Sequence, residues 1–305
     1  MQPEPKERDL DVVVVGNVGV DTNVYPYGDE IDWTVEANFT RNVDCVGQAG
    51  GYACRGYARL GLRTAFVGSV GEDFCGQYVR EELERDGIDL SALFVDPAGT
   101  SRSVNFMYRD GRRKNFYDGG SHMTLRPDLG ACRRVLSRAR LAHFHIPNWA
   151  RLLLPAAREL GLLVACDLQD LVRLPDAYRQ DFVDASDVLF FSAVNHSDPA
   201  PLIRTLCAGR PGRLVVAGMG ARGCALGTGA EVRFFPPAPL DIPVVDTNGA
   251  GDALAVGFLY AWAVQRLSPE EAVRRGQIAA RFTCAIRASS SSLITREQLE
   301  RLAGG

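Results

Sequence analysis

The sequence predicts an α/β fold, with a mostly parallel central sheet and helices on both of its faces. Continuous apolar runs, the first of them rich in valine, recur along the chain, and segments with helical character lie between them. Such runs are typical of strands that are covered on both faces. Strand–helix alternation indicates a parallel sheet, and ligands of such sheets bind beyond the carboxyl ends of the strands.

The expected elements follow one another in order. Six apolar runs are expected to be strands of the main sheet: 11–16, 64–70, 141–146, 162–167, 187–191 and 213–217. Six segments are expected to be helices: 50–60, 73–86, 126–138, 151–160, 175–185 and 198–208. Near the C-terminus, Ser268 followed by Pro269 and Glu271 predicts a capped helix, and Thr295 with Gln298 predicts a second one.

Two regions interrupt this alternation. Residues 22–45 and 101–118 have the composition of strands joined by turns, with no helix between them. In the second region, Asp110-Gly111 separates two aromatic-rich runs and predicts a hairpin. We expect both regions to form a small antiparallel sheet that acts as a lid at the edge of the main sheet. No repeat or linker divides the chain, so we expect residues 1–305 to form a single domain.

Composition and charge exclude several classes of partner. The chain has 305 residues and a formal net charge of −3, so we expect neither nucleic acid nor a membrane as a partner. The first ten residues are polar, and no apolar run reaches the ~18 residues of a membrane helix. The eight cysteines contain no Cys-x-x-Cys pair. These features predict a cytoplasmic protein with reduced thiols.

The most informative stretch is DTNGAGD at 246–252, directly before an apolar helical pattern. The first amides of a helix lack internal partners, and Gly249, Ala250 and Gly251 leave such amides open to an anion. Asp252 adds a carboxylate that can accept the proton of an attacking hydroxyl. A capped helix start would explain one or two of these residues, but not the whole run. The stretch therefore indicates phosphoryl transfer.

This run resembles the signature Asp-Thr-x-Gly-Ala-Gly-Asp of the ribokinase-like (PfkB) carbohydrate kinases. Three other segments resemble the same family in the right order: GNVGVD at 16–21, the stretch 47–76, and GMGARGC at 218–224. The resemblance implies a ribokinase-like fold in which Asp252 is the catalytic base and the amides of Gly249, Ala250 and Gly251 form an anion hole. It also implies that Asp21 binds hydroxyl groups of the acceptor.

The acceptor loop departs from the family pattern Gly-Gly-x-x-x-Asn-x-Ala. Gly50 and Gly51 are present and permit close backbone approach, whereas Tyr52 replaces the asparagine that commonly binds a sugar hydroxyl. We expect these three residues to contact the acceptor. The tyrosine leaves the choice between a sugar and a nucleoside open.

The nucleotide side also departs from the family. The resemblance implies that ATP binds at Ser192, Gly218, Gly220, Gly223 and Gln277. The usual Asn-x-x-Glu, which helps to organise Mg²⁺, is replaced by Ser192-Ala193-Val194-Asn195, and Gly218 stands where threonine is common. We therefore expect the metal to be held differently. The resemblance further implies K⁺ near Asp246 and a homodimer formed through the lid.

Two histidines and a basic triplet receive a plainer interpretation. His143 and His145 share one face of a strand, but no third metal ligand lies nearby in sequence, so we interpret them as ordinary buried or strand-end histidines. A substrate contact from His145 or Asn148 is the alternative. Arg112 with its two basic neighbours is interpreted as a solvated cluster at a hairpin tip rather than a phosphate clamp.

The aromatic residues of the small sheet are interpreted as packing or dimer contacts rather than as a stacking platform for a nucleobase. They are Phe39, Phe106, Tyr108, Phe116 and Tyr117.

The sequence thus predicts an ATP-dependent kinase that phosphorylates a hydroxymethyl group of a sugar or sugar-like molecule, with Mg²⁺ on the ATP phosphates and a closing lid. Two alternatives stay open. A nucleoside kinase on the same fold agrees with Tyr52 and the aromatic lid. A catalytically weak regulator that binds sugar or nucleotide agrees with the missing Asn-x-x-Glu carboxylate, although Asp252 argues against it.

Overall fold

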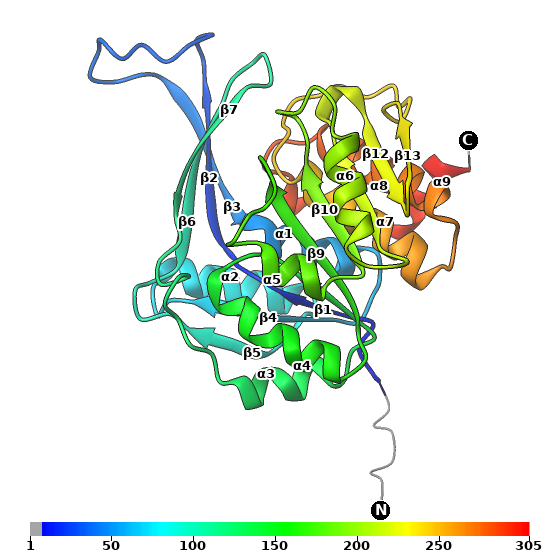
Figure 1. Cartoon of the computed structure of the whole chain (residues 1–305). Coiled ribbons are helices and arrows are strands. Elements are labelled where there is room, and N and C mark those ends of the chain that lie inside the picture. The colour runs from blue at the N-terminus through cyan, green and yellow to red at the C-terminus, as the bar shows by residue number, and fades with distance from the viewer. Residues whose placement is uncertain (1–7, 305) are drawn as a thin grey trace, which may run out of the picture.

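The computed structural model describes residues 8–304 and contains a large and a small sheet (Figure 1). The polar segment 1–7 lies outside the described residues. The large sheet has the strand order β13-β12-β11-β10-β9-β8-β1-β4-β5. Its strands are β1 (Val12–Val15), β4 (Thr64–Val70), β5 (Asp89–Val95), β8 (Leu141–Phe144), β9 (Leu163–Asp170), β10 (Val188–Ser192), β11 (Leu214–Gly218), β12 (Cys224–Thr228) and β13 (Glu231–Phe235). From β11 across to β5 in this order, neighbouring strands pair in parallel. Strand β12 pairs antiparallel with β11, and β13 pairs antiparallel with β12.

Helices cover both faces of this sheet. One face packs against α1 (Gln48–Arg59), α2 (Phe74–Arg85), α7 (Ala250–Leu259), α8 (Pro269–Thr283) and α9 (Arg296–Ala303). The other packs against α3 (Leu129–Leu136), α4 (Leu154–Glu159), α5 (Gln180–Ala185) and α6 (Ala200–Ala208). Short helical segments are η1 (Asn148–Leu153), η2 (Gly220–Arg222), η3 (Tyr260–Val264) and η4 (Ser289–Ser291). The predicted α/β class is confirmed.

Strand β1 shows why its sequence is apolar without interruption. Val12 and Val14 enter the core under α1 and α7, whereas Val13 and Val15 enter the core under α3 and α4. All four side chains are fully buried. Alternate side chains of a strand point to opposite faces, so a strand with helices on both sides buries every residue.

The predicted helix caps are confirmed, but some elements differ from the prediction. Ser268 accepts a hydrogen bond from the amide of Glu271, and Thr295 forms a capping box with Gln298. Strands β5, β12 and β13 were not expected. The helix expected at 175–185 begins only at Gln180.

The small sheet has the order β3-β2-β6-β7, and it stands beside the large sheet in Figure 1. Its strands are β2 (Gly19–Pro26), β3 (Thr40–Gly47), β6 (Ser101–Met107) and β7 (Arg113–Asp118). The outer pairs are antiparallel, but β2 and β6 pair in parallel. Strands β4 and β5 of the large sheet lie between β2 and β6 in the sequence, which gives the long connection that a parallel pair needs. We call these four strands the lid.

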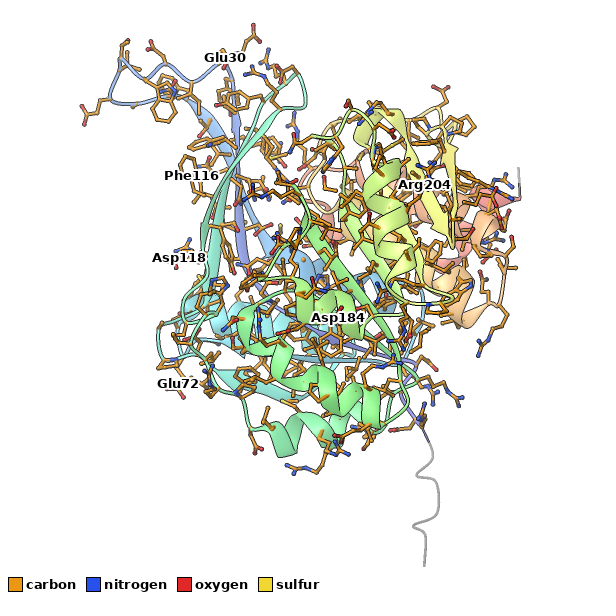
Figure 2. The ribbon with its side chains drawn as sticks, viewed as in Figure 1. Glu30, Glu72, Phe116, Asp118, Asp184 and Arg204 are labelled. Carbon is orange, nitrogen blue, oxygen red and sulfur yellow. The ribbon has the colours of Figure 1, made fainter. Side chains whose placement is uncertain are left out.

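The hairpin predicted in the lid is present. The amide of Tyr108 donates to the carbonyl of Arg112 at 3.0 Å, and Gly111 has a φ of 85°, which suits glycine. In Figure 2, Glu30 lies at the tip of the lid, and Phe116 and Asp118 lie along its outer strand.

Two global expectations concern membranes and thiols. Among the described helices, none has both the length and the apolar content that a membrane span needs. All eight cysteines are free, and all except Cys75 are buried, in agreement with the prediction of unpaired thiols.

Candidate active site

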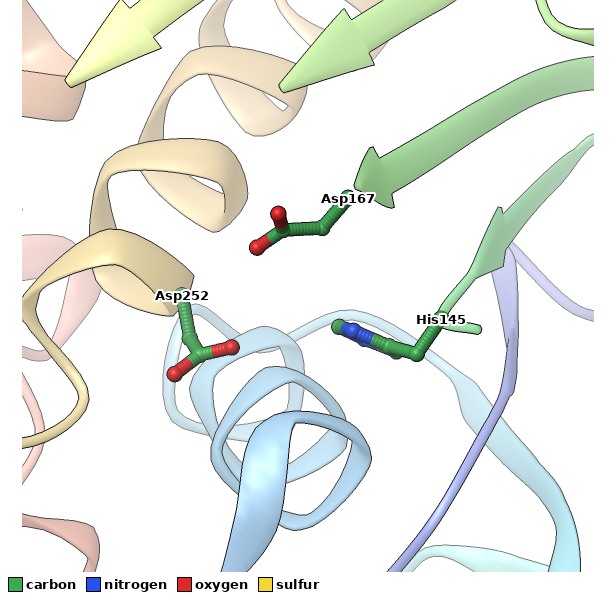
Figure 3. Close-up of side chains that lie close together, drawn as sticks. All are labelled: His145, Asp167 and Asp252. Carbon is green, nitrogen blue, oxygen red and sulfur yellow. The ribbon is translucent and has the colours of Figure 1, made fainter. Parts of the chain in front are cut away.

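Three side chains that lie far apart in the sequence meet at the carboxyl edge of the large sheet (Figure 3). Asp167 lies near the end of β9, His145 directly follows β8, and Asp252 lies in the first turn of α7. One ligand atom of each residue lies within 4.8 Å of the other two. Strands β8 and β9 are parallel neighbours, so their carboxyl ends share one edge of the sheet.

Two glycines with different roles shape the start of α7. Gly249 has a φ of 75°, and a Cβ there would lie 2.7 Å from the ring of Tyr52. Gly251 is exposed, and a Cβ there would meet no atom within 4 Å. Because α7 begins at Ala250, the amides of Gly251 and Asp252 precede the first internal helix bonds.

The electrostatics of this site weaken the acidity of its carboxyl groups. Burial raises the pKa of Asp252 well above its usual range, the negative charge of Asp167 raises it further, and Arg113 lowers it. Burial also raises the pKa of Asp167, to about 6. Burial lowers the pKa of His145, so its imidazole is neutral. The site therefore combines a neutral imidazole with two carboxyl groups that hold their protons more tightly than exposed acids do.

Asn248 connects the α7 loop to the acceptor side and to the lid. Its side-chain nitrogen donates to Asp21 at 3.0 Å and to the hydroxyl of Tyr52 at 2.9 Å. Its side-chain oxygen accepts a 2.7 Å hydrogen bond from Arg113, which is the first residue of β7. The other oxygen of Asp21, Oδ1, is buried and makes no hydrogen bond within residues 8–304. Burial raises the pKa of Asp21, and the bond from Asn248 opposes that effect.

A row of amide side chains runs through the lid to the same point. Asn115 donates to Asn105 at 2.7 Å, Asn105 donates to Asn23 at 3.1 Å, and Asn248 donates to Asn23 at 3.3 Å. Asn23 and Asn105 are buried, so these bonds satisfy polar groups that would otherwise be costly. The lid and the α7 loop are thus one hydrogen-bonded unit.

Asp246 anchors this unit. Its Oδ1 accepts the amide of Asn248 at 2.8 Å, and its Oδ2 accepts the hydroxyl of Tyr25 at 2.5 Å and the amide of Ala288 at 3.2 Å. Burial raises the pKa of Tyr25, and the bond to Asp246 adds to that rise. The carboxylate therefore holds strand β2 of the lid, the α7 loop and the segment after α8 together.

The residues predicted from the acceptor loop are all buried. A Cβ at Gly50 would lie 2.5 Å from the carbonyl of Asn17, and a Cβ at Gly51 would lie 3.0 Å from the side chain of Val18. Both glycines thus permit close approach of the protein's own chain to α1. Tyr52 is 3% exposed, and its hydroxyl accepts a hydrogen bond from Asn248 inside the protein.

The residues predicted to bind ATP lie mainly at turns. Ser192 and Gly218 are paired in register at the ends of β10 and β11. Gly220 and Gly223 shape the following turn, with φ angles of 59° and 90°. Gln277 is buried and donates to the carbonyl of Phe235 at 3.3 Å, beside a cavity of about 380 Å³.

A carboxylate lies beside residues 192–195, which replace the Asn-x-x-Glu motif of the family. Asp170, at the end of β9, pairs in register with Ser192, and its Oδ1 lies 3.5 Å from the amide nitrogen of Asn195. Mg²⁺ prefers oxygen ligands, and it is often held by one or two carboxylates together with substrate phosphates. The carboxylate of Asp170 is therefore of the ligand type that fits Mg²⁺.

Sequence reasoning missed several of these groups. Asp167 and Asn248 were given no role, although one ends a predicted strand and the other occupies the variable position of the signature. The interpretation of the basic triplet as a solvated cluster is incomplete for Arg113, which is exposed but also donates to Asn248. It is confirmed for Arg112, which is exposed and pairs with Asp110 and Glu30.

Two further expectations are refined by the structure. Among the three amides expected to form the anion hole, that of Ala250 makes a long turn bond of 3.4 Å to Thr247. His143 is an ordinary buried histidine, bonded to Tyr57 at 3.0 Å. His145 is also buried, but the fold places it beside Asp167 and Asp252, which together with it could hold a metal ion.

Comparison with known proteins agrees with this geometry. Residues 9–296 match the model of the pfkB family carbohydrate kinases, and the chain belongs to this family. Its homologues carry the names of sugar kinases. The chain is 33% identical over 298 residues to an acarbose 7(IV)-phosphotransferase of Actinoplanes sp., across 95% of this chain and 97% of that protein. It is 26% identical over 227 residues to a fructoselysine 6-kinase of Escherichia coli, across 74% and 84% of the two chains.

Solved structures show the same fold. A microbiome-derived acarbose kinase superposes with a TM-score of 0.89 at 28% identity, covering 97% of this chain and all of the other. A nucleoside kinase of Methanocaldococcus jannaschii superposes with a TM-score of 0.78 at 17% identity, covering 98% and 99% of the two chains. At that identity the likeness concerns the fold alone.

Proposed function

We propose that the protein transfers the γ-phosphoryl group of ATP to a hydroxymethyl group of a sugar or sugar-like molecule, with Asp252 as the base. The observation that carries this proposal is the position of Asp252 in the first turn of α7, next to the exposed Gly251. A base and a set of amides at one point are what phosphoryl transfer requires.

In this mechanism, Asp252 accepts the proton of the acceptor hydroxyl while that oxygen bonds to the γ-phosphorus. The bond between this phosphorus and the oxygen that bridges to the β-phosphate breaks, and ADP leaves. The amides of Gly249, Ala250 and Gly251 stabilise the charge on the transferred group. Burial and the neighbouring Asp167 raise the pKa of Asp252, which makes its carboxylate a stronger base.

The acceptor is held by side chains on the lid side. The unpaired Oδ1 of Asp21 accepts a hydroxyl of the acceptor, and Asn248 fixes the other oxygen of this carboxylate. Arg113 places a positive charge of the lid at the same point. Gly50, Gly51 and Tyr52 set the shape of this side of the site.

The nucleotide is proposed to lie along Ser192, Gly218, Gly220, Gly223 and Gln277. Asp170 and Asn195 would hold Mg²⁺, which neutralises charge on the phosphates when it is bound. A potassium ion beside Asp246, a homodimer formed through the lid and a cytoplasmic location stay predictions of the family resemblance.

The names of the relatives suggest which acceptors to test first. We propose that the acceptor is a pseudo-oligosaccharide such as acarbose, or a sugar conjugate such as fructoselysine. We rank acarbose ahead of fructoselysine because the identity to the acarbose-phosphorylating relative is 33% across nearly the whole chain.

The test measures ADP release with ATP and Mg²⁺ across acarbose, fructoselysine, ribose and a nucleoside. Asp252→Asn is compared with Asp184→Asn, a matched change on α5 (Figure 2). We expect acceptor-dependent turnover that falls about 10²–10⁴-fold in Asp252→Asn and is unchanged in Asp184→Asn. Full turnover in Asp252→Asn would refute its role as base. Turnover with the nucleoside alone would refute the sugar acceptor.

A further inference from the structure

We propose that His145, Asp167 and Asp252 form a binding site for a zinc-class transition-metal ion, and that this ion inhibits the kinase. The binding site follows from the geometry of the three side chains. Only the inhibition rests on the proposed function, because it requires Asp252 to be the base.

The three donors are already close to the separation that a metal needs. Their ligand atoms lie within 4.8 Å of one another, and they come from β9, from α7 and from the residue directly after β8, which meet at the edge of the sheet (Figure 3). Zinc binds imidazole nitrogen and carboxylate oxygen at about 2.0–2.2 Å, so ligand atoms around it lie roughly 3–4 Å apart. Oδ1 of Asp167 accepts the amide of Gln169 at 2.7 Å, so Asp252 and the other oxygen of Asp167 would move toward the ion.

The imidazole of His145 points independently to a ligand. The side chain is fully buried, and neither ring nitrogen has a hydrogen-bond partner within the described residues. A buried polar group without a partner costs about 1–3 kcal/mol, so such a group in a native site calls for an explanation. Figure 3 shows the ring pointing into the space between Asp167 and Asp252.

The surroundings hold this ring in place. A Cβ at Gly16 would lie 2.9 Å from the ring of His145, so the chain packs closely against it. His143 lies next to it, with ring centroids 4.7 Å apart, but Nδ1 of His143 already bonds to Tyr57. Nε2 of His143 also has no partner among the described residues, but it is the ligand atom of His145 that lies within 4.8 Å of the two carboxylates.

The donor set selects the kind of ion. One imidazole and two carboxylates suit Zn²⁺ and Co²⁺, whereas Mg²⁺ prefers oxygen ligands alone. Three protein ligands leave a fourth position open, as in catalytic zinc sites. Here one of the three ligands is the proposed base. An ion bound to Asp252 would lower the basicity of this carboxylate through its positive charge, so the ion would inhibit transfer.

The test titrates nucleotide-free protein with Co²⁺ and follows its visible absorption, and Zn²⁺ then displaces the bound cobalt. A Cys75→Ser background removes the one cysteine that is not buried. We expect one strong site, and a binding constant about 100-fold weaker in His145→Phe, which keeps an aromatic ring at this position but removes the ligand nitrogen. His122→Phe, which changes a half-buried histidine outside the cluster, is the matched control and should bind cobalt normally.

The melting temperature is a second readout, and it also shows whether each variant is folded. Binding to the native state raises the melting temperature, so Zn²⁺ should stabilise the parent protein but neither His145→Phe nor His145→Gln. Equal cobalt affinity in the parent and in both variants, or no binding by the parent, would overturn the proposal. Zinc should also inhibit ADP release by the parent protein at a concentration that does not inhibit His145→Phe. If Asp252→Asn retained full turnover, the base would be wrong, but a His145-dependent cobalt spectrum would still establish the site.

Discussion

The two sides of the candidate active site are built in different ways. On the acceptor side, buried side chains from the lid, α1 and the α7 loop bond to one another through Asn248. On the nucleotide side, the predicted residues are mostly glycines at turns, together with Ser192 at a strand end.

The difference explains where the chain can depart from its family. Backbone amides and open turns tolerate a change of side chain, so Gly218 in place of threonine removes little. A buried network tolerates a change only where hydrogen bonding is kept, because each partner removed leaves another polar group unsatisfied. Tyr52, which departs from the family pattern, supplies a hydroxyl that bonds to Asn248. We therefore infer that specificity resides in the acceptor side, and the following predictions test this contrast from the largest expected effect to the smallest.

The largest effect is expected where the network meets the helix. In Gly249→Ala, the residue would adopt a left-handed conformation, and its Cβ would lie 2.7 Å from the ring of Tyr52. We expect a loss of about 3 kcal/mol in the free energy of unfolding, from roughly 1–2 kcal/mol of backbone strain and a similar overpacking cost. Urea denaturation measures it. Gly251→Ala is the control, because its Cβ meets nothing within 4 Å. Equal stability in both variants would contradict this account.

The second prediction concerns Arg113. In Arg113→Ala, Asn248 loses a charged partner that donates at 2.7 Å, so its position becomes less fixed. We expect kcat/KM for the acceptor to fall about 10-fold, which corresponds to roughly 1.4 kcal/mol, while KM for ATP stays constant. Arg112→Ala, on the same hairpin, removes a side chain that pairs with the exposed Asp110 and Glu30 and lies over the ring of Tyr108, and it should change neither value. A matching loss in both variants would show that the hairpin contributes only general charge.

The third prediction concerns Asp73, which connects α2 to the start of strand β6 of the lid, and the pH dependence of its contribution to stability. Asp73 caps α2 and accepts 2.7 Å hydrogen bonds from the amide and hydroxyl of Thr100, just before β6. Burial alone would raise the pKa of Asp73, but the bonds from Thr100 and Gly76 outweigh it and lower the pKa.

The unfolded chain therefore binds this proton more readily than the folded chain. The stabilisation is complete above the ordinary pKa of 3.8 and disappears as the pH falls through the lowered pKa. Asp73→Ala should lose about 1 kcal/mol at pH 7, a modest value because the side chain is exposed. Denaturation at several pH values should show this difference shrinking below pH ~3.8. A difference that grew at low pH would have the wrong sign.

The smallest effect is expected on the nucleotide side. Ser192→Ala removes one hydroxyl at a half-buried strand end, and the backbone pairing of β10 with β11 remains. We expect KM for ATP to rise less than about 3-fold, the range of one weak hydrogen bond. Steady-state kinetics with varied ATP measures it. A rise of 100-fold would mean that side chains, not the backbone, hold the nucleotide.

The sequence predicts the fold better than it predicts the site. Valine-rich β1 and the DTNGAGD stretch carry strong local signals, because period and turn chemistry act within a few residues. Strands β5, β12 and β13 were missed. β5 and β13 are the two edges of the large sheet, and their partly exposed residues interrupt the apolar run that marks a central strand.

The site residues that were missed depend on long-range contacts. Arg113 and Asn248 are 135 residues apart, and only the pairing of the lid strands brings them together. His145 and Asp167 belong to neighbouring strands, so their proximity follows from sheet order and not from spacing. Tyr52 was expected at the acceptor surface, whereas the close packing of α1 keeps it behind Asn248.

The most direct test of the central claim is the single-turnover rate of phosphoryl transfer from ATP to acarbose, with both substrates saturating. We compare the parent protein with Asp252→Asn and confirm by equilibrium dialysis that both bind ATP equally. Our account predicts equal binding and a transfer rate that falls about 10²–10⁴-fold in the variant. Equal transfer rates in the two proteins would contradict the assignment of Asp252 as the base.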